Sequence, residues 1–195
     1  MRFTLLPDPR FRKHASALVD RLDQAAKLIT RETFDDFADD LITSILADSF
    51  DAAGADEGTL WLVNPGKGEL DAVFNNGPTS AKILKHHQKL DRGLISMVFS
   101  TGQPFCENNI AQNPDHDKAV DRATGISTTA MIAVPFYFAQ QCRGIVSCVQ
   151  LGNEPKSSRT GFDMESMREV SRAASLLTRL FDFKLISRII GYGHN

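Results

Sequence analysis

The chain has 195 residues, of which 42% are hydrophobic and 24% are charged, as expected for one globular domain with long flanking elements. Its formal net charge of -2 gives no support for nucleic acid or an anionic membrane as the main partner. No apolar run approaches the ~18 residues of a membrane span, and the first residues lack a secretory layout, so we expect a cytoplasmic protein.

Residues 1–31 are predicted to contain a first helix with a narrow apolar seam. Apolar residues are spaced alternately by four and three positions at Phe11, Ala15, Leu18, Leu22, Ala25 and Ile29. Such a seam is narrower than the stripe of a helix that lies on a core. It favours either a dimer contact or packing on the chain's own sheet.

Residues 32–182 are predicted to form the main domain. A second helix, capped by Thr33 and ended by Gly54, has a wide apolar stripe that suits packing on a sheet. Two strands follow at 59–63 and 70–75. Residues 80–89 and 94–100 are predicted to be helical, 104–107 to be a short strand, and 108–125 to be a long polar connection with its own short helix.

The hairpin at residues 130–153 is predicted to be the centre of the sheet. Two β-prone runs flank the short polar tip at 140–143. Both runs are apolar on both parities, so both faces should be covered, by helices or by a ligand in place of one helix layer.

The last helix is predicted to run from an Asp163 cap to about Ile190. One seam of the helix consists of Met167, Val170, Ala174, Leu177 and Phe181. Residues 183–195, the end of this helix and the tail, turn apolar on several sides, which predicts that a partner covers them.

Several short motifs then give the chain a family resemblance. They are Asp91-Arg92-Gly93, Ser100 to Pro104, Asn113-Pro114, Ile132 to Pro135, Arg143 to Val146, Gln150-Leu151, Asn153 and Phe162. In this order and spacing the chain resembles a GAF domain over about residues 30–182. The resemblance implies an α+β, profilin-like fold with a central antiparallel sheet of five to six strands. Long N- and C-terminal helices would cover one face, and small helices and loops would roof a ligand pocket on the other.

The resemblance also implies which residues line the pocket. In ligand-binding relatives the position of Gln150 points into the pocket, so Leu151, Val149 and Ile145 would face the terminal helices. The candidate ligand-binding residues are Phe74, Asn75, Phe105, Glu107, Asn108, Ile110, Asp121, Arg122, Thr128, Thr129, Met131, Cys148 and Gln150. A Gln150 side chain turned toward the terminal helices, or a space filled by hydrophobic groups, would end the sensor hypothesis.

Cyclic nucleotide binding stays open, although the family's signature for it is incomplete. Asn153 and Phe162 match the signature, but Glu154 stands where lysine is expected, and Ser166 and Met167 replace the acidic pair. The internal ion pair of that signature therefore cannot form.

We find no catalytic, metal or cofactor constellation. The segments in which related sulfoxide reductases carry cysteines, residues 93–96 and 119–121, have none, and the cysteine–histidine pair of bilin-binding relatives is missing. His86 and His87 would point about 100° apart on a helix, and Asp115-His116-Asp117 lacks a fourth ligand.

The sequence therefore predicts a bacterial sensory or regulatory domain that binds a small molecule and forms a homodimer through its terminal helices. It would pass the signal to a partner or output domain. The alternatives are a ligand-free interaction module with a vestigial pocket and a thiol-dependent reductase that uses Cys106 or Cys148.

Overall fold

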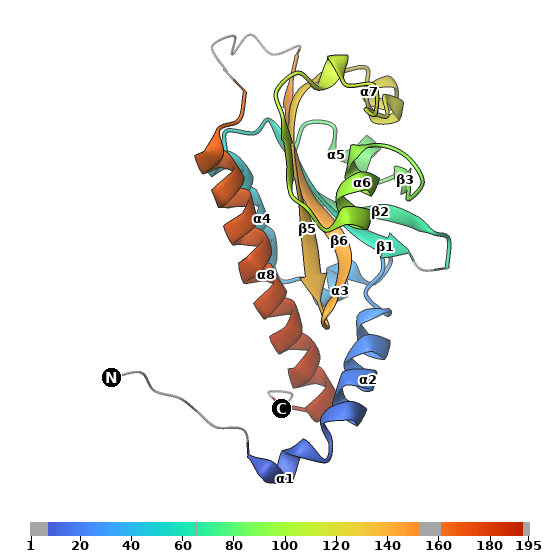
Figure 1. Ribbon diagram of the computed structural model, residues 1–195, viewed down its shortest axis with the longest axis vertical. Coiled ribbons are helices and arrows are strands. Elements are labelled where there is room, and N and C mark those ends of the chain that lie inside the picture. Colours follow the sequence, from blue (N-terminus) through green and yellow to red (C-terminus); the bar gives the residue numbers. More distant parts are fainter. Residues whose placement is uncertain (1–7, 65, 153–160, 193–195) are drawn as a thin grey trace.

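One six-stranded antiparallel sheet organises the fold, with helices on both of its faces (Figure 1). The computed structural model describes residues 8–64, 66–152 and 161–192. In the order in which they pair, the strands are β3 (His87–Lys89), β2 (Glu69–Asn75), β1 (Glu57–Asn64), β6 (Gln141–Leu151), β5 (Thr128–Phe138) and β4 (Phe105–Glu107). The predicted α+β fold and strand number are confirmed. Asn153 and Glu154 lie outside the described residues.

The helices divide between the two faces of the sheet. The long helices α4 (Asp40–Ala52) and α8 (Met164–Ile190) cover one face, here called the helix side, together with α2 (Ala15–Ala26) and α3 (Phe34–Phe37). Four short helices lie over the other face, here called the roof side: α5 (Ser80–Ile83), α6 (Leu94–Thr101), η1 (Ile110–Gln112) and α7 (Ala119–Thr124). The short α1 (Pro9–Arg12) precedes α2. None of the helices in the described part of the chain has the length and hydrophobicity to cross a bilayer.

The β5–β6 hairpin is the covered centre of the sheet, as its double-sided apolar pattern predicts. Ala139 and Gln140 form its tip with φ of 48° and 63°, the positive values that a tight two-residue hairpin turn needs. Along β5, alternate residues Ala130, Ile132, Val134, Phe136 and Phe138 join the core on the helix side. Met131 and Ala133 join the core on the roof side.

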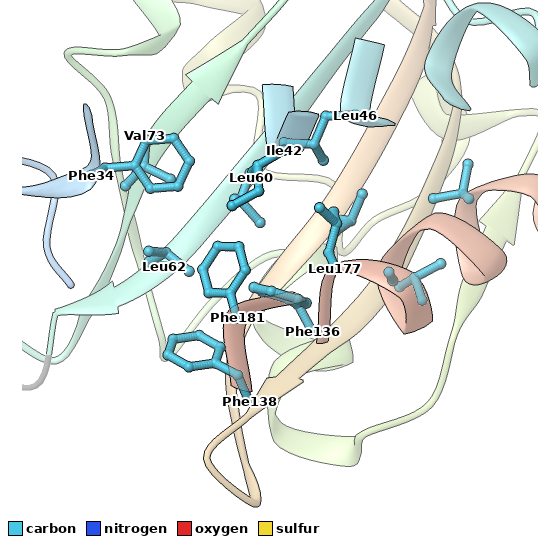
Figure 2. Close-up of a cluster of buried hydrophobic side chains, with 14 of the residues drawn as sticks. Phe34, Ile42, Leu46, Leu60, Leu62, Val73, Phe136, Phe138, Leu177 and Phe181 are labelled. Atoms are coloured by element: carbon cyan, nitrogen blue, oxygen red, sulfur yellow. The ribbon is translucent and has the colours of Figure 1, made fainter. Parts of the chain in front are cut away.

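An aromatic cluster anchors α8 to the sheet (Figure 2). The ring of Phe181 lies 4.8 Å from that of Phe37, 4.9 Å from that of Phe136 and 5.1 Å from that of Phe138, measured between centroids. Phe34, Leu46, Leu60 and Leu177 extend this core, and all are almost completely buried. The seam predicted on the last helix therefore packs inside the chain.

The later part of the predicted first seam also packs inside the chain, whereas its first two residues, Phe11 and Ala15, are exposed. Leu22, Ala26 and Ile29 are buried in the helix-side core, with Leu18 and Ala25 packed against it. In Figure 1, α2 lies beside the C-terminal half of α8, beyond the end of the sheet. A dimer contact through residues 1–31 stays a prediction.

Two predicted helices differ from the structure. The helix expected after Thr33 is interrupted at Ala38, whose ψ of 140° is extended, and Asp39 rather than Thr33 caps α4. The Thr33 hydroxyl instead donates to the Leu28 carbonyl at 2.5 Å. The predicted helix at 80–89 ends at Ile83, and His87–Lys89 pairs with β2 as an edge strand.

Candidate functional site: a cavity between sheet and roof

A cavity lies between the roof side of the sheet and the short helices. Its volume is about 50 Å³, which exceeds the ~15 Å³ that one water needs but is far below the ~300–1,000 Å³ of pockets for drug-sized ligands. The sheet contributes Glu57, Thr59, Trp61, Gln88, Thr128, Met131, Ser147, Cys148, Val149 and Leu151 to the lining. The roof and its connections contribute Thr79, Ile83, Gly93, Leu94, Ile95, His116, Asp117, Val120, Asp121, Thr124 and Ile126.

The floor is fixed by strand register. Thr59 pairs with Asn75 of β2 and with Ser147 of β6, so these three residues form one row across the sheet. Asn75 Nδ2 donates to Thr59 Oγ1 at 2.9 Å. Trp61 Nε1 donates to Ser147 Oγ at 2.9 Å, which fixes the indole ring in the floor.

Glu57 connects the start of β1 to the roof. Its side chain is buried, with only 4% of the residue exposed, and its Oε2 accepts from Thr79 Oγ1 at 2.6 Å and from the Thr79 amide at 3.2 Å. Gly77 allows this approach, because a Cβ there would lie 2.2 Å from Glu57 Cγ. The carboxylate thereby holds the segment that begins α5.

Asp121 connects α7 to the start of β5. Its Oδ1 accepts from Thr128 Oγ1 at 2.8 Å, and its Oδ2 accepts from the Thr128 amide at 3.3 Å. The buried ring of His116 places Nε2 3.2 Å from the same Oδ2. Lys82 then ties α5 to α7 by donating to the Thr124 carbonyl at 3.1 Å. These side-chain hydrogen bonds add to the apolar packing of the roof, in which Ile83 of α5 and Val120 of α7 take part.

His86 lies at the edge of the roof beside Trp61. The two rings meet edge to face with centroids 6.3 Å apart. Burial lowers the pKa of His86 below its usual range, although the nearby charge of Asp117 acts in the opposite direction.

A second group of potential ligands lies at the β2–β3 edge. Glu69, Asp71 and His87 place their ligand atoms within 4.8 Å of one another. Burial alone would raise the pKa of Asp71, but hydrogen bonds from His87 and Asn64 and the positive charge of Arg31 together hold this pKa below its usual value. Arg31 Nη2 lies 3.8 Å from Asp71 Oδ1. A metal ion here would have to displace this guanidinium, so these three side chains are better explained as an ion-pair cluster with Arg31 than as a metal site.

The predicted site residues fall into two sets. Asp121, Thr128, Met131 and Cys148 line the cavity. The others lie outside the lining: Phe74, Asn75, Phe105, Glu107, Asn108, Ile110, Arg122, Thr129 and Gln150.

The contacts of the second set explain their positions. Phe74 packs against the helix-side core, whereas Ile110 and Phe105 belong to the roof-side packing. Asn108 bonds the Phe162 backbone through both its amide atoms at 2.8 and 2.9 Å.

Three further members of the second set lie on strands β5 and β4 and on helix α7. Thr129 donates to the Gln150 carbonyl, Glu107 accepts from the Asn109 amide, and the Arg122 side chain is exposed.

The predicted orientation of Gln150 is wrong. Its Nε2 donates to the carbonyl of Gly54, just after α4, at 3.1 Å and to that of Gly161, just before α8, at 3.5 Å. On β6 the alternate residues Ser147, Val149 and Leu151 line the cavity instead. Because β6 has apolar residues at both odd and even positions, its sequence alone does not show which set faces the cavity. The polar residues Glu57 and Thr59 of β1 and Ser147 of β6, which share one face of the sheet, are the signal that could have shown it.

The cysteines are separated by strand register. Cys106 and Cys148 each pair with Ile132, from opposite sides, so one strand lies between them. Strands are about 4.8 Å apart, so their Cα atoms are about 10 Å apart, beyond the ~7 Å limit for a disulfide. Burial raises the pKa of both thiols.

Comparison with known proteins identifies the family to which this fold belongs. The model of the GAF domain family matches residues 32–182. No curated protein sequence matches the chain. Among solved structures, the GAF domain of a phosphoenolpyruvate-protein phosphotransferase from Coxiella burnetii has a TM-score of 0.62 at 19% identity, covering 89% of this chain and 98% of its own.

Two further solved structures share the fold. Free methionine-R-sulfoxide reductase from Neisseria meningitidis, solved with its substrate, has a TM-score of 0.56 at 15% identity over 97% of this chain and 98% of its own. The second GAF domain of DevS from Mycobacterium smegmatis has a TM-score of 0.59 at 15% identity, covering 76% of this chain and 96% of its own. At these identities the likeness supports the fold alone. Since the family model spans most of the chain, the protein belongs to the GAF domain family.

Proposed function

We propose that this GAF domain is a sensory module that binds a small molecule in the cavity and transmits binding to α4 and α8. The cavity is the observation that carries the proposal, because its lining combines buried polar groups with apolar side chains such as Trp61, Met131 and Val149. The orientation of Gln150 ends the sensor site predicted from the sequence, which had this side chain in the cavity. The present proposal rests on a different set of residues, Glu57, Trp61 and Asp121, together with the alternate residues of β6.

Transmission requires that the ligand favour one arrangement of the domain over another. The roof is suited to this because α5 and α7 are short and are held by a few hydrogen bonds, at Glu57, Asp121 and Lys82, and by the packing of Ile83 and Val120. A ligand larger than the present 50 Å³ would have to move these segments.

The test is thermal unfolding of the full chain with a panel of cyclic nucleotides, nucleobases, amines and amino acids. A ligand at about 100 times its Kd stabilises by about 2.7 kcal/mol, which raises Tm by roughly 5–10 °C for a domain of this size. Val149→Phe, which fills the cavity, should abolish the shift, whereas Val19→Phe on the exposed face of α2 should keep it.

The small cavity volume favours a second candidate, a ligand-free interaction module with a vestigial pocket. Native mass spectrometry of gently purified protein separates the two. A copurified molecule that is lost in Val149→Phe supports the sensor. A bare mass, together with no shift for any member of the panel, supports the interaction module.

We further propose that the domain is not an enzyme and that it acts as a homodimer. The first proposal is supported by the raised pKa and the separation of Cys106 and Cys148. The second is supported by Leu176, Phe183 and Ile190, which are exposed at intervals of seven along the 27-residue α8. That spacing forms one stripe, as in paired helices.

A further inference from the structure

The cavity lining has an unbalanced charge. Among the described residues that line the cavity, Glu57, Asp117 and Asp121 contribute carboxylates and none is a lysine or arginine. Asp117 has a cationic neighbour outside the lining, Arg122, whose Nη2 lies 4.0 Å from its Oδ1. His116 is the one basic group among the described lining residues, and its Nε2 already lies against Asp121. A cavity of this kind disfavours an anionic ligand and attracts a cationic one, because fixed charges act strongly when they are removed from water.

Glu57 is the least compensated of the three acids. Its two hydrogen bonds both come from Thr79 and both reach Oε2, so within the described residues Oε1 accepts no hydrogen bond. Glu57 forms no ion pair with any described residue, although only 4% of it is exposed. Among the described residues, the one fully buried side-chain nitrogen or oxygen without a hydrogen-bond partner is Arg31 Nε, so Glu57 Oε1 keeps some accessible surface through which a cationic donor can reach it.

Two further groups in the lining suit a cation that carries hydrogen-bond donors. Gln88 is 4% exposed, and its Nε2 donates to the Arg92 carbonyl at 2.8 Å, while its Oε1 accepts nothing from the described part of the chain. Trp61 adds an indole ring, the side chain whose face attracts cations most strongly, held in place by its bond to Ser147.

The arrangement of the acidic groups in the cavity suits an organic cation better than a metal ion. Within residues 8–64, 66–152 and 161–192, the one group of three metal-capable side chains at ligand spacing is Glu69, Asp71 and His87, which lies outside the cavity. The carboxylates of the cavity do not converge on a common point in this way. They and the indole ring instead suit a ligand with a charged end and an apolar body.

We propose that the cavity binds a small organic ammonium ion whose charge lies against Glu57 and whose apolar part lies over Trp61. The inference rests on the proposed sensory function and names the class of its ligand. A phosphate or carboxylate ligand, cyclic nucleotides included, would meet three acids and no lysine or arginine in the lining.

The chain contains a single tryptophan, so the fluorescence of Trp61 reports on this cavity. The full-length protein is titrated in phosphate buffer, since Tris is itself an ammonium. Ionic strength is held constant with sodium chloride. The probes are ethylammonium and tetramethylammonium chloride, with ethanol as the neutral analogue, alanine as the zwitterion, and sodium propionate and cyclic AMP as anions.

We expect a saturable change with at least one ammonium ion and none with propionate or cyclic AMP. Glu57→Gln should weaken ammonium binding at least tenfold, because the new amide can still accept from Thr79 but carries no charge. Glu165→Gln, which removes one exposed charge at the start of α8, should leave the affinity unchanged.

Several outcomes would overturn the inference. Saturation by an anion or by ethanol alone overturns the ammonium ligand and leaves the sensory function standing, as does equal affinity in Glu57→Gln and the parent. No response to any probe, with no copurified molecule in native mass spectrometry, contradicts both proposals. The comparison of cation with anion uses the unaltered protein, so it remains decisive if Glu57→Gln does not fold.

Discussion

Asp39 joins the start of α4 to Lys184 of α8, which is 145 residues away in the chain. Its Oδ1 accepts from the Ile42 amide at 3.1 Å and caps α4, while its Oδ2 accepts from Lys184 Nζ of α8 at 2.6 Å. The hydrogen bond from Lys184 is the main reason why the pKa of Asp39 lies below its usual value. A single carboxylate thus holds the start of α4 against the later part of α8.

Asp39→Ala should lower the free energy of unfolding by about 1 kcal/mol at pH 7, the usual cost of losing a helix cap. Asp39→Asn should cost less, because asparagine also caps and the half-exposed ion pair contributes little. A carboxyl with a lowered pKa stabilises above its unfolded pKa of about 3.9, and this contribution is lost as the pH falls through the folded value.

Urea unfolding of both variants at pH 7 and at pH 3.5 measures these differences. The cost of Asp39→Ala should shrink at the lower pH. An equal cost at both values would show that the charge of Asp39 is not involved.

Single residues divide into those whose role follows from local chemistry and those whose role depends on distant partners. Asp163 was predictable as a cap, since its carboxylate needs only the Ser166 amide three residues on, at 2.8 Å. Gln150 was not, because its partners, the carbonyls of Gly54 and Gly161, are fixed by how the two long helices end. Glu57 and Thr79 meet across 22 residues, which no spacing rule in the sequence indicates.

At the scale of elements, α8 depends on its aromatic anchor. Phe181→Ala should lower the free energy of unfolding by about 3–5 kcal/mol, because the deletion leaves a cavity among Phe37, Phe136 and Phe138. Met164→Ala, an exposed apolar residue of the same helix, should change it by less than about 0.5 kcal/mol. Denaturant unfolding at one protein concentration measures both. A similar cost for the two variants would contradict the anchoring role of the cluster.

Elements with a strong period were predictable, and short ones were not. The helix α8 and the strands β5 and β6 were predictable because the spacing of their own apolar residues indicates the type of structure. β3 has only three residues, and its pairing with β2 places His87 beside Asp71, so its strand form comes from the sheet. The break at Ala38 likewise follows from Asp39, because an aspartate stabilises a helix more as its N-cap than at a position inside it.

The proposed homodimer belongs to the scale of the whole molecule, and the exposed stripe on α8 tests it. If the protein is a dimer through this stripe, Phe183→Glu should convert it to a monomer, because a charge would have to be buried in the helix pair. Met97→Glu on α6, at the roof side, should leave the dimer intact. Light scattering coupled to size exclusion measures the mass of each. A dimer that survives Phe183→Glu would exclude this stripe as the contact.

The two bonds of Gln150 give the fold a mechanical property. One amide group fastens the strand under the cavity to the loop that leaves α4 and to the loop that enters α8. A shift of that strand would therefore be expected to act on the end of α4 and the start of α8 together rather than on one alone. The residue that the family likeness assigned to the ligand is, in this structure, a link between the sheet and both long helices.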